Sequence, residues 1–256
     1  MKVAILAGGR GTRLTPETDF RPKPMVEVGG RPLLWHIMHH YARYGHEEFV
    51  IALGFLGDVI KRYIVEYGML NGSLRVDFRT QATVPLGERR LDWRVELVET
   101  GLETLTGARL RRLAPQLRGG TFMLTYGDGV SDVDLDAVLA FHRSHGRLAT
   151  LTAVHPPARF GHLAFDGDRV AGFSEKPQIG EGWINGGFFV FEPGVLDLIP
   201  EGERIALELH VLPRLAAEGE LHAYRHPAFW QCMDTPRDQQ LLESIWQSGK
   251  APWKTW

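Results

Sequence analysis

The chain has 256 residues, of which 44% are hydrophobic and 23% charged, with a formal net charge of −2. This composition allows a large buried core, and the balanced charge gives no reason to expect nucleic acid or a membrane surface as a partner. Cys232 is the only cysteine, so an intrachain disulfide is excluded, which favours a cytoplasmic protein. The chain opens directly into a predicted strand, so we expect no signal peptide. No apolar run approaches the roughly 20 residues that cross a bilayer.

The first half of the chain alternates between strand and helix patterns. Short apolar runs predict buried strands, and the segments between them carry apolar residues at helical spacing. This alternation is typical of an α/β fold with a doubly wound, mostly parallel, Rossmann-like sheet and helices on both faces. The predicted strands are 3–6, 49–53, 74–78, 95–98 and 121–126, and the predicted helices are 32–44, 59–67 and 108–117, with a polar segment at 80–92.

The second half has shorter strands, interrupted by Gly, Pro and Asp residues that favour turns. We expect a helix at 135–145 and a strand at 149–154, then a smaller antiparallel portion with strands at 163–165, 170–173 and 188–191. Helices follow at 207–217 and 236–246. The tail 250–256 carries two tryptophans, so we expect it to pack on the body or on a neighbouring subunit. No shift in composition marks a boundary, and we predict one domain over 1–256.

A glycine-rich segment follows the first predicted strand at once. Residues 7–14 read Ala-Gly-Gly-Arg-Gly-Thr-Arg-Leu, and three glycines in four positions let several N–H groups point at one ligand. Such a nest binds anions, above all phosphate. Arg10 and Arg13 add positive charge, and Lys23 could supply a third cation. The segment predicts a triphosphate site, although glycines after a strand can also form only a tight turn.

Two common phosphate motifs do not fit this segment. Its glycines lack the third glycine of the dinucleotide fingerprint, and the Gly-Lys-Ser/Thr ending of a P-loop is absent. A dehydrogenase-like dinucleotide binder is weakened further because no acidic residue is clearly placed to bind a ribose.

The stretch Leu-Ala-Gly-Gly-x-Gly-Thr-Arg-Leu at 6–14, followed by Pro-Lys-Pro-Met at 22–25, resembles the signature of sugar-phosphate nucleotidylyltransferases. The resemblance covers almost the whole chain. It implies a nucleotide-binding half at 1–130, a sugar-binding half at 131–256, and a homo-oligomer. It is closest to members that transfer a cytidylyl group from CTP to glucose 1-phosphate, on the segments 23–30, 35–38, 125–130, 149–153 and 184–189.

Two aspartates have contexts that allow two interpretations. Asp128 lies between two glycines after a predicted strand, where a carboxylate can hold a hard cation, although Asp-Gly is also typical of a plain turn. Asp234 precedes Thr235-Pro236, a pattern typical of a helix N-terminal cap. The resemblance implies that both carboxylates bind Mg2+ together, with Arg13, Lys23 and Asp128 as the catalytic residues.

The resemblance implies two further groups of binding residues. For Arg109 a second interpretation stays open, since it could instead be a surface residue of the basic helix at 108–117. The residues implied to bind the nucleotide are Leu6, Ala7, Gly8, Gly9, Arg10, Gly11, Thr12, Arg13, Lys23, Thr104, Thr106, Gly107 and Arg109. Those implied to bind the sugar phosphate are Gly161, Glu175, Lys176 and Asn185.

Several alternatives stay open at this point. The nucleotide could be UTP or dTTP, because spacing and composition cannot distinguish a cytosine pocket from a uracil pocket. Another sugar 1-phosphate is possible, since Cys232 and the segments 80–92 and 207–210 depart from the pattern. A catalytically silent homologue that binds a nucleotide sugar would have no need for the two metal-binding aspartates. We interpret Cys232 as a packing residue and the histidines at 36, 39 and 40 as structural or surface residues.

Overall fold

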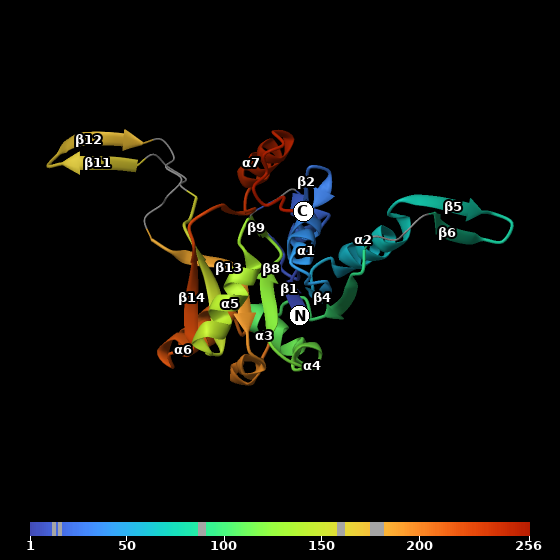
Figure 1. Ribbon diagram of the computed structural model, residues 1–256, viewed down its shortest axis with the longest axis horizontal. Helices are drawn as coiled ribbons and strands as arrows, with labels where there is room; N and C mark the ends of the chain where they lie inside the picture. The colour runs from blue at the N-terminus through green and yellow to red at the C-terminus, as the bar shows by residue number, and fades with distance from the viewer. Residues whose placement is uncertain (12–13, 15–16, 87–90, 158–161, 175–181) are drawn as a thin grey trace.

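The computed structural model describes residues 1–11, 14, 17–86, 91–157, 162–174 and 182–256, with the backbone alone at 162–166 and 172–174. Its centre is a seven-stranded sheet in the order β14-β10-β13-β8-β1-β4-β7 (Figure 1). The ladders β1–β4, β1–β8, β4–β7 and β10–β14 are parallel. The strands are β1 (Lys2–Leu6), β4 (Glu48–Leu53), β7 (Arg94–Glu99), β8 (Phe122–Tyr126), β10 (Ala149–Val154), β13 (Ile184–Phe191) and β14 (Leu221–His226). The predicted fold class is confirmed.

Helices cover both faces of this sheet because its strands are apolar on both sides. In β1, Val3 and Ile5 join one core cluster, and Ala4 and Leu6 join the other. The first cluster takes in α1 (Leu33–Arg43), α2 (Gly57–Leu70), α5 (Leu135–His145) and α7 (Pro236–Gln247). The second takes in α3 (Thr106–Arg112), α4 (Ala114–Leu117), α6 (Leu212–Ala217), the 3-10 helix η4 (Pro193–Leu198) and the π-helical turn η5 (Leu207–Val211).

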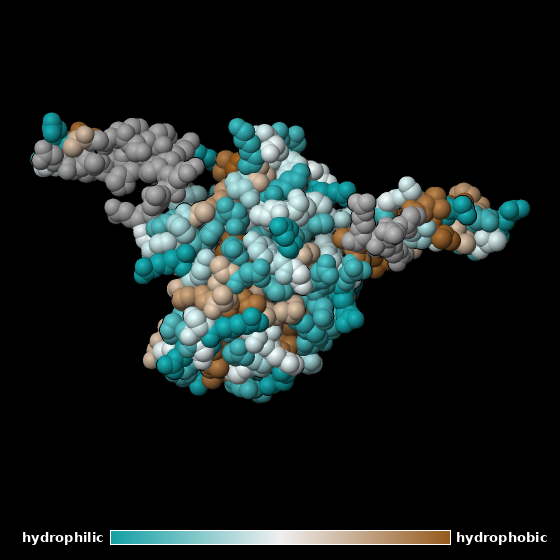
Figure 2. Space-filling model, viewed as in Figure 1, coloured by the Kyte–Doolittle hydropathy of each residue, from teal (hydrophilic) through white to brown (hydrophobic). Residues whose placement is uncertain are grey.

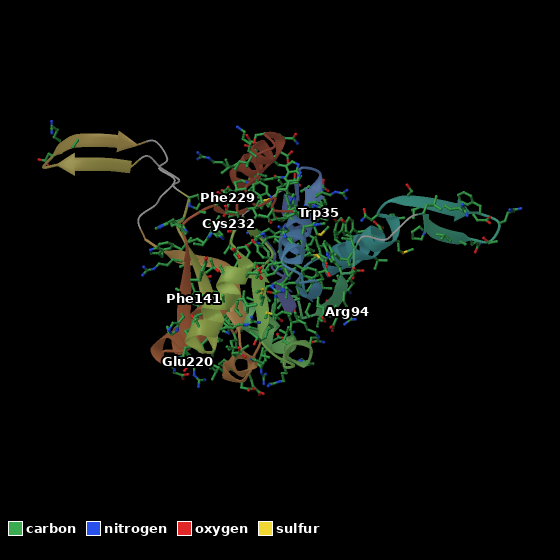
Figure 3. The ribbon with its side chains drawn as sticks, in the orientation of Figure 1. Trp35, Arg94, Phe141, Glu220, Phe229 and Cys232 are labelled. Carbon is green, nitrogen blue, oxygen red and sulfur yellow. The ribbon has the colours of Figure 1, made fainter. Side chains whose placement is uncertain are left out.

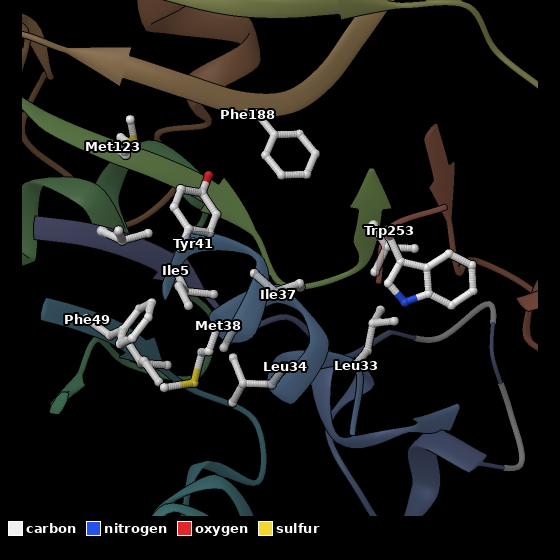
Figure 4. Packing of buried hydrophobic residues seen from close by; sticks show 14 of the residues in the cluster. Ile5, Leu33, Leu34, Ile37, Met38, Tyr41, Phe49, Met123, Phe188 and Trp253 are labelled. Atoms are coloured by element: carbon white, nitrogen blue, oxygen red, sulfur yellow. The ribbon is translucent and has the colours of Figure 1, made fainter. Parts of the chain in front are cut away.

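Large side chains fill the space between α1 and the sheet (Figure 4). Tyr41 of α1 is fully buried and its ring stacks on Phe188 of β13, with centroids 6.3 Å apart. Burial of such rings stabilises the fold by about 2–3 kcal/mol each. The C-terminal tail packs on this same body, because Trp253 is 1% exposed and its indole N–H lies 3.3 Å from Nδ1 of His36.

In the part of the chain that the structure describes, four two-stranded pairs lie outside the central sheet. Two of them project as arms on opposite sides of the body (Figure 1). Two short 3-10 helices, η2 (Glu17–Asp19) and η3 (Lys23–Met25), lie between β1 and the first pair. The pairs are β2 (Glu27–Val28) with β3 (Arg31–Pro32), β5 (Ser73–Asp77) with β6 (Ala82–Leu86), β9 (Gly129–Ser131) with β15 (Trp230–Cys232), and β11 (His162–Asp166) with β12 (Arg169–Ser174).

Three predicted elements differ from the structure. The run 188–191 is not in a smaller antiparallel portion: it belongs to β13, which lies antiparallel between β8 and β10 in the central sheet. The strand at 74–78 does not join the central sheet either, because β5 pairs with β6 inside the segment that was expected to be merely polar. The helix at 207–217 begins with a π-helical turn before α6. Among the described residues, no helix is long and apolar enough to cross a membrane.

Candidate active site

A cleft of about 330 Å³ opens at the carboxyl ends of β1 and β8, where ligands bind in open parallel sheets. The register pairs Leu6 of β1 with Tyr126 of β8, so the segments that follow the two strands leave the sheet side by side. Most of the predicted nucleotide-binding residues that the structure describes line this cleft. Its lining is Leu6, Ala7, Gly8, Gly9, Gly11, Lys23, Pro24, Thr104, Leu105, Thr106, Arg109, Tyr126, Gly127, Asp128 and Asp234.

Lys23 lies between the two predicted metal-binding aspartates. Its Nζ donates to Oδ2 of Asp128 at 2.8 Å and also to Oδ1 of Asp234. The lysine is 9% exposed. Burial alone would lower its pKa, but attraction and hydrogen bonds from Asp128 and then Asp234 outweigh this, so the pKa of Lys23 is raised above its usual 10.5. Three residues that are far apart in the sequence therefore form one charged cluster.

The small sheet formed by β9 and β15 brings the two aspartates together. Cys232 pairs with Gly129, and the N–H of Met233 donates to the carbonyl of Asp128 at 2.8 Å, so Asp128 and Asp234 flank the end of one ladder. Cys232 lies at the end of the molecule that carries α7 (Figure 3). Burial, and then the charges of Asp234 and Asp128, raise the pKa of this thiol to about 11, which agrees with a packing residue rather than a nucleophile.

Asp234 is not the N-terminal cap of α7. Thr235 is the N-cap of α7: its hydroxyl accepts from the N–H of Asp238, and Asp238 accepts in return from the N–H of Thr235. This capping box leaves the Asp234 carboxylate directed at Lys23. Asp128 does lie in a turn, but its side chain also reaches Lys23.

The glycine segment rests on Arg109, which is 4% exposed and is therefore not a surface residue of α3. A Cβ on Gly8 would clash with the guanidinium, and one on Gly54 would lie 2.5 Å from Nη1. Burial, and then Arg112, lower the pKa of Arg109, but an arginine stays charged in proteins. The guanidinium donates to five oxygen atoms: the carbonyls of Gly8, Leu53, Gly101 and Leu102, and Oγ1 of Thr100.

These contacts place Arg109 where it supports the backbone of the glycine segment. The N–H groups of its Nη1 and Nη2 are used on the protein, and its charge lies directly beneath the backbone of the predicted phosphate nest. Gly11 has φ +63°, a conformation that glycine adopts without strain, and its backbone packs against the Lys23 side chain. Arg10 is exposed and pairs with Glu103 at 2.6 Å, with its guanidinium 5.6 Å from the Phe55 ring centroid.

Three residues of the segment 104–107 also line the cleft, namely Thr104, Leu105 and Thr106. The N-cap of α3 is Leu105. The Thr104 hydroxyl accepts from Arg112 at 3.0 Å, and the Thr106 hydroxyl donates to Glu208 at 2.6 Å. Gly107 packs against the backbone at 205–207 instead of lining the cleft, since a Cβ there would lie 3.0 Å from the carbonyl of Ile205.

Asn185 does not line the cleft itself but lies beside Tyr126, which does. Its Nδ2 donates to the Tyr126 hydroxyl at 3.4 Å, and its Oδ1 accepts from the N–H of Gly187 at 2.9 Å. Tyr126 and Glu208 were not predicted as site residues. The position of Tyr126, directly before Gly127-Asp128 at a strand end, was a usable signal. The predicted residues Thr12, Arg13, Gly161, Glu175 and Lys176 lie outside the described residues.

The residues present fit a hard cation. The two aspartates contact one ammonium group, so their oxygens converge on a single cation position, and Mg2+ takes its remaining ligands from water and substrate phosphates. Over the described ranges, no cluster of three or more His, Cys, Asp or Glu side chains could hold a metal. The histidines of α1 are structural: burial lowers the pKa of His36 and His40 to about 4, and Nε2 of His36 lies 2.9 Å from the carbonyl of Val28.

A mostly parallel sheet with a glycine nest and a lysine-aspartate cluster at its carboxyl edge defines a nucleotide-binding α/β protein, and comparison with known proteins identifies the family. The chain belongs to the family described as nucleotidyl transferase, whose model matches residues 2–244. The resemblance found in the sequence is thereby confirmed.

Two relatives agree with this family, and a solved structure has the same fold. The chain is 48% identical to the glucose-1-phosphate cytidylyltransferase of Salmonella typhi over 258 residues, covering all of both chains. It is 39% identical to the probable glucose-1-phosphate cytidylyltransferase of Bacillus subtilis, again over the whole of both chains. HddC from Yersinia pseudotuberculosis, in a crystal structure complexed with GMP-PN, has the same fold, with a TM-score of 0.70, 22% identity, and coverage of 96% of this chain and 99% of that one.

Proposed function

We propose that this protein transfers a cytidylyl group from CTP to α-D-glucose 1-phosphate, giving CDP-glucose and pyrophosphate. The observation that carries the proposal is the cluster of Lys23, Asp128 and Asp234 beside the glycine nest, at the carboxyl ends of β1 and β8. The full-length similarity to glucose-1-phosphate cytidylyltransferases supports the choice of nucleotide and sugar.

The reaction is a single in-line displacement. A phosphate oxygen of the sugar 1-phosphate attacks the α-phosphorus of CTP, a new P–O bond forms, and the bond to pyrophosphate breaks. The nucleophile is already an anion, so no strong general base is required. The obstacle is bringing two polyanions together, and catalysis is therefore positioning plus electrostatic stabilisation.

Each residue has a separate part in this scheme. The N–H groups of the glycine nest and Arg13 hold the β- and γ-phosphates, with the buried charge of Arg109 beneath the nest. Lys23 contacts the α-phosphate as it becomes more negative. Lys176 holds the sugar phosphate, and Glu175 and Asn185 accept hydrogen bonds from sugar hydroxyls.

Asp128 and Asp234 hold Mg2+, which when bound offsets phosphate charge and helps to orient the reacting groups. The two carboxylates leave most coordination positions to water and phosphate oxygens, so we expect metal binding to depend strongly on the nucleotide.

We further propose a homo-oligomer and a single domain. The exposed apolar side chains of the β5–β6 arm support a subunit contact, and strands from both halves of the chain share one sheet, which supports a single domain. A nucleoside triphosphate substrate and a single unpaired cysteine favour the cytoplasm.

Product analysis tests the proposed function. With CTP, glucose 1-phosphate and Mg2+, we expect CDP-glucose and pyrophosphate in equal amounts, and we expect removal of the metal by a chelator to abolish both. Formation of CMP in place of CDP-glucose would contradict transfer to the sugar. Binding of CDP-glucose without any turnover would instead support a silent homologue.

A further inference from the structure

We propose that Glu208 is a positioning residue that couples the nucleotide side of the cleft to its sugar side. The inference rests on the proposed function, since it assigns the two sides to the two substrates. Glu208 lies in the π-helical turn η5 and is half-buried. It does not line the cleft itself, but it hydrogen-bonds to two residues that do, Thr106 and Tyr126.

Both carboxylate oxygens of Glu208 accept a hydrogen bond from a cleft residue. Oε2 accepts from the Thr106 hydroxyl at 2.6 Å, and Oε1 accepts from the Tyr126 hydroxyl. The oxygen of Thr106 in turn accepts from the N–H of Leu207 at 2.8 Å. An ionised carboxylate can only accept, so it fixes the direction of both hydroxyl protons. One side chain thereby orients two walls of the cleft.

The network continues to the sugar side through Tyr126. Because its proton points at Glu208, the Tyr126 oxygen is an acceptor towards Asn185, whose Nδ2 lies 3.4 Å away. The other end of the Asn185 amide is fixed by the N–H of Gly187. The Tyr126 ring is also held in place, since a Cβ on Gly187 would lie 2.5 Å from it.

The neighbours of Glu208 in η5 do not share this position. Leu207 is fully buried in the core, and Leu209 is 74% exposed. His210 accepts from the backbone N–H of Ala206 at 3.1 Å. Of the segment 207–210, which departs from the family pattern, Glu208 is therefore the residue through which a change would reach the cleft.

The substitution Glu208→Gln tests the coupling. An amide keeps one acceptor but replaces the other with a donor, so Thr106 and Tyr126 can no longer both donate to it. We expect the calorimetric dissociation constants and the KM values for CTP and for glucose 1-phosphate each to rise about tenfold or more, the scale of a lost hydrogen bond to a charged group. We expect kcat and the melting temperature to change much less.

Two single-arm variants and a matched control make the test specific. We expect Thr106→Val to weaken the binding of CTP alone, and Tyr126→Phe to weaken the binding of glucose 1-phosphate alone. In a double-mutant cycle, adding Glu208→Gln to Tyr126→Phe should not lower the affinity for glucose 1-phosphate any further. The control is Glu201→Gln, the same chemical change at an exposed pair with Arg111, for which we expect wild-type affinities.

Unchanged dissociation constants in Glu208→Gln would overturn the coupling, and so would additive effects of the two variants on sugar binding. If both affinities fall together with the melting temperature and the fraction of active protein, Glu208 has a merely structural role, and the coupling is also overturned. Because calorimetry needs no turnover, a wild-type protein that binds both substrates without reacting would contradict the proposed function alone. Failure to bind either substrate would overturn both.

Discussion

Lys23 has the most charged environment among the described residues of the cleft. Its ammonium group is buried between Asp128 and Asp234, so removal of the lysine would leave two neighbouring carboxylates without their cation. In the proposed reaction the same three side chains face the phosphates, so we expect their replacement to lower the rate.

We therefore expect Lys23→Ala or Asp128→Ala to lower kcat by roughly 10²–10⁴-fold, the scale at which single electrostatic groups act in catalysis. Lys61→Ala is the matched control: Lys61 also contacts two carboxylates, Asp58 and Glu99, but at an exposed position on α2. The rate of pyrophosphate release gives kcat for the cleft variants and for the control. Near-normal turnover in either cleft variant would refute the assigned role.

A second prediction concerns the floor of the glycine nest. A Cβ at Gly8 would overlap the Arg109 guanidinium, which is held by five hydrogen bonds, whereas a Cβ at Gly9 would have nothing within 4 Å. Overpacking costs about 1–3 kcal/mol. We expect Gly8→Ala to lower the melting temperature by several degrees and Gly9→Ala to leave it unchanged. Equal melting temperatures of the two variants would show that the Arg109 side chain moves aside at little cost in free energy.

Single residues also mark what the sequence could and could not reveal. Asp128 and Asp234 each had a plain interpretation, and only the β9–β15 ladder and the Thr235 cap show that both side chains reach Lys23. The burial of Arg109 was not predictable, because a helix with several arginines does not reveal which one faces inward. Glu208 was noticed only as part of a departing segment.

At the scale of elements, apolar runs predicted strands well but not their direction. Residues 188–191 are buried on both faces of the sheet, and such a run reads the same in a parallel or an antiparallel strand. The strand β6 was missed because its side chains are largely exposed, so it lacks the pattern of a half-buried strand. Helix α1 was predicted closely because its buried residues recur at helical spacing.

Helix α1 also makes stability depend on pH. Burial lowers the pKa of His39 from 6.5 to about 4, with smaller effects from His36 and Arg31. Between pH 6.5 and 4 the unfolded chain therefore binds more protons at this position than the folded one, and stability falls as the pH falls. We expect the melting temperature to be lower at pH 5 than at pH 7.5.

His39→Phe keeps the ring that stacks on Trp256, at 5.3 Å between centroids, but cannot be protonated. We expect this variant to show a drop in melting temperature between the two pH values that is roughly 2 °C smaller than in the wild type. An identical drop would indicate that burial does not lower the pKa of His39 in the folded protein, and would contradict this prediction.

At the scale of the whole molecule, the β5–β6 arm is a separate two-stranded hairpin that projects from the body (Figure 1). A two-stranded hairpin is marginal alone, and apolar side chains extend along this one (Figure 2). Leu74 and Val76 share one face with Pro85, and Phe78 follows in the turn after β5 at 90% exposure. An exposed apolar arm of this kind is typical of a contact between subunits.

We expect the wild type to be a homo-oligomer, and replacement of Val76 and Phe78 by serine to lower its mass in light scattering. Val170→Ser, at a half-exposed valine of the other arm in β12, is the control and should leave the mass unchanged. A monomeric wild type, or an unchanged mass in the double variant, would exclude this arm as the subunit contact.

The most direct test of the cytidylyl transfer is pyrophosphate release with Mg2+ and glucose 1-phosphate, measured side by side with CTP, UTP, dTTP, ATP and GTP. We expect release with CTP and little or none with the other four. Release with a different nucleotide would contradict the cytidylyl assignment while keeping the fold and the mechanism. No release with any of the five, nor with other sugar 1-phosphates as acceptors, would contradict the enzymatic function itself.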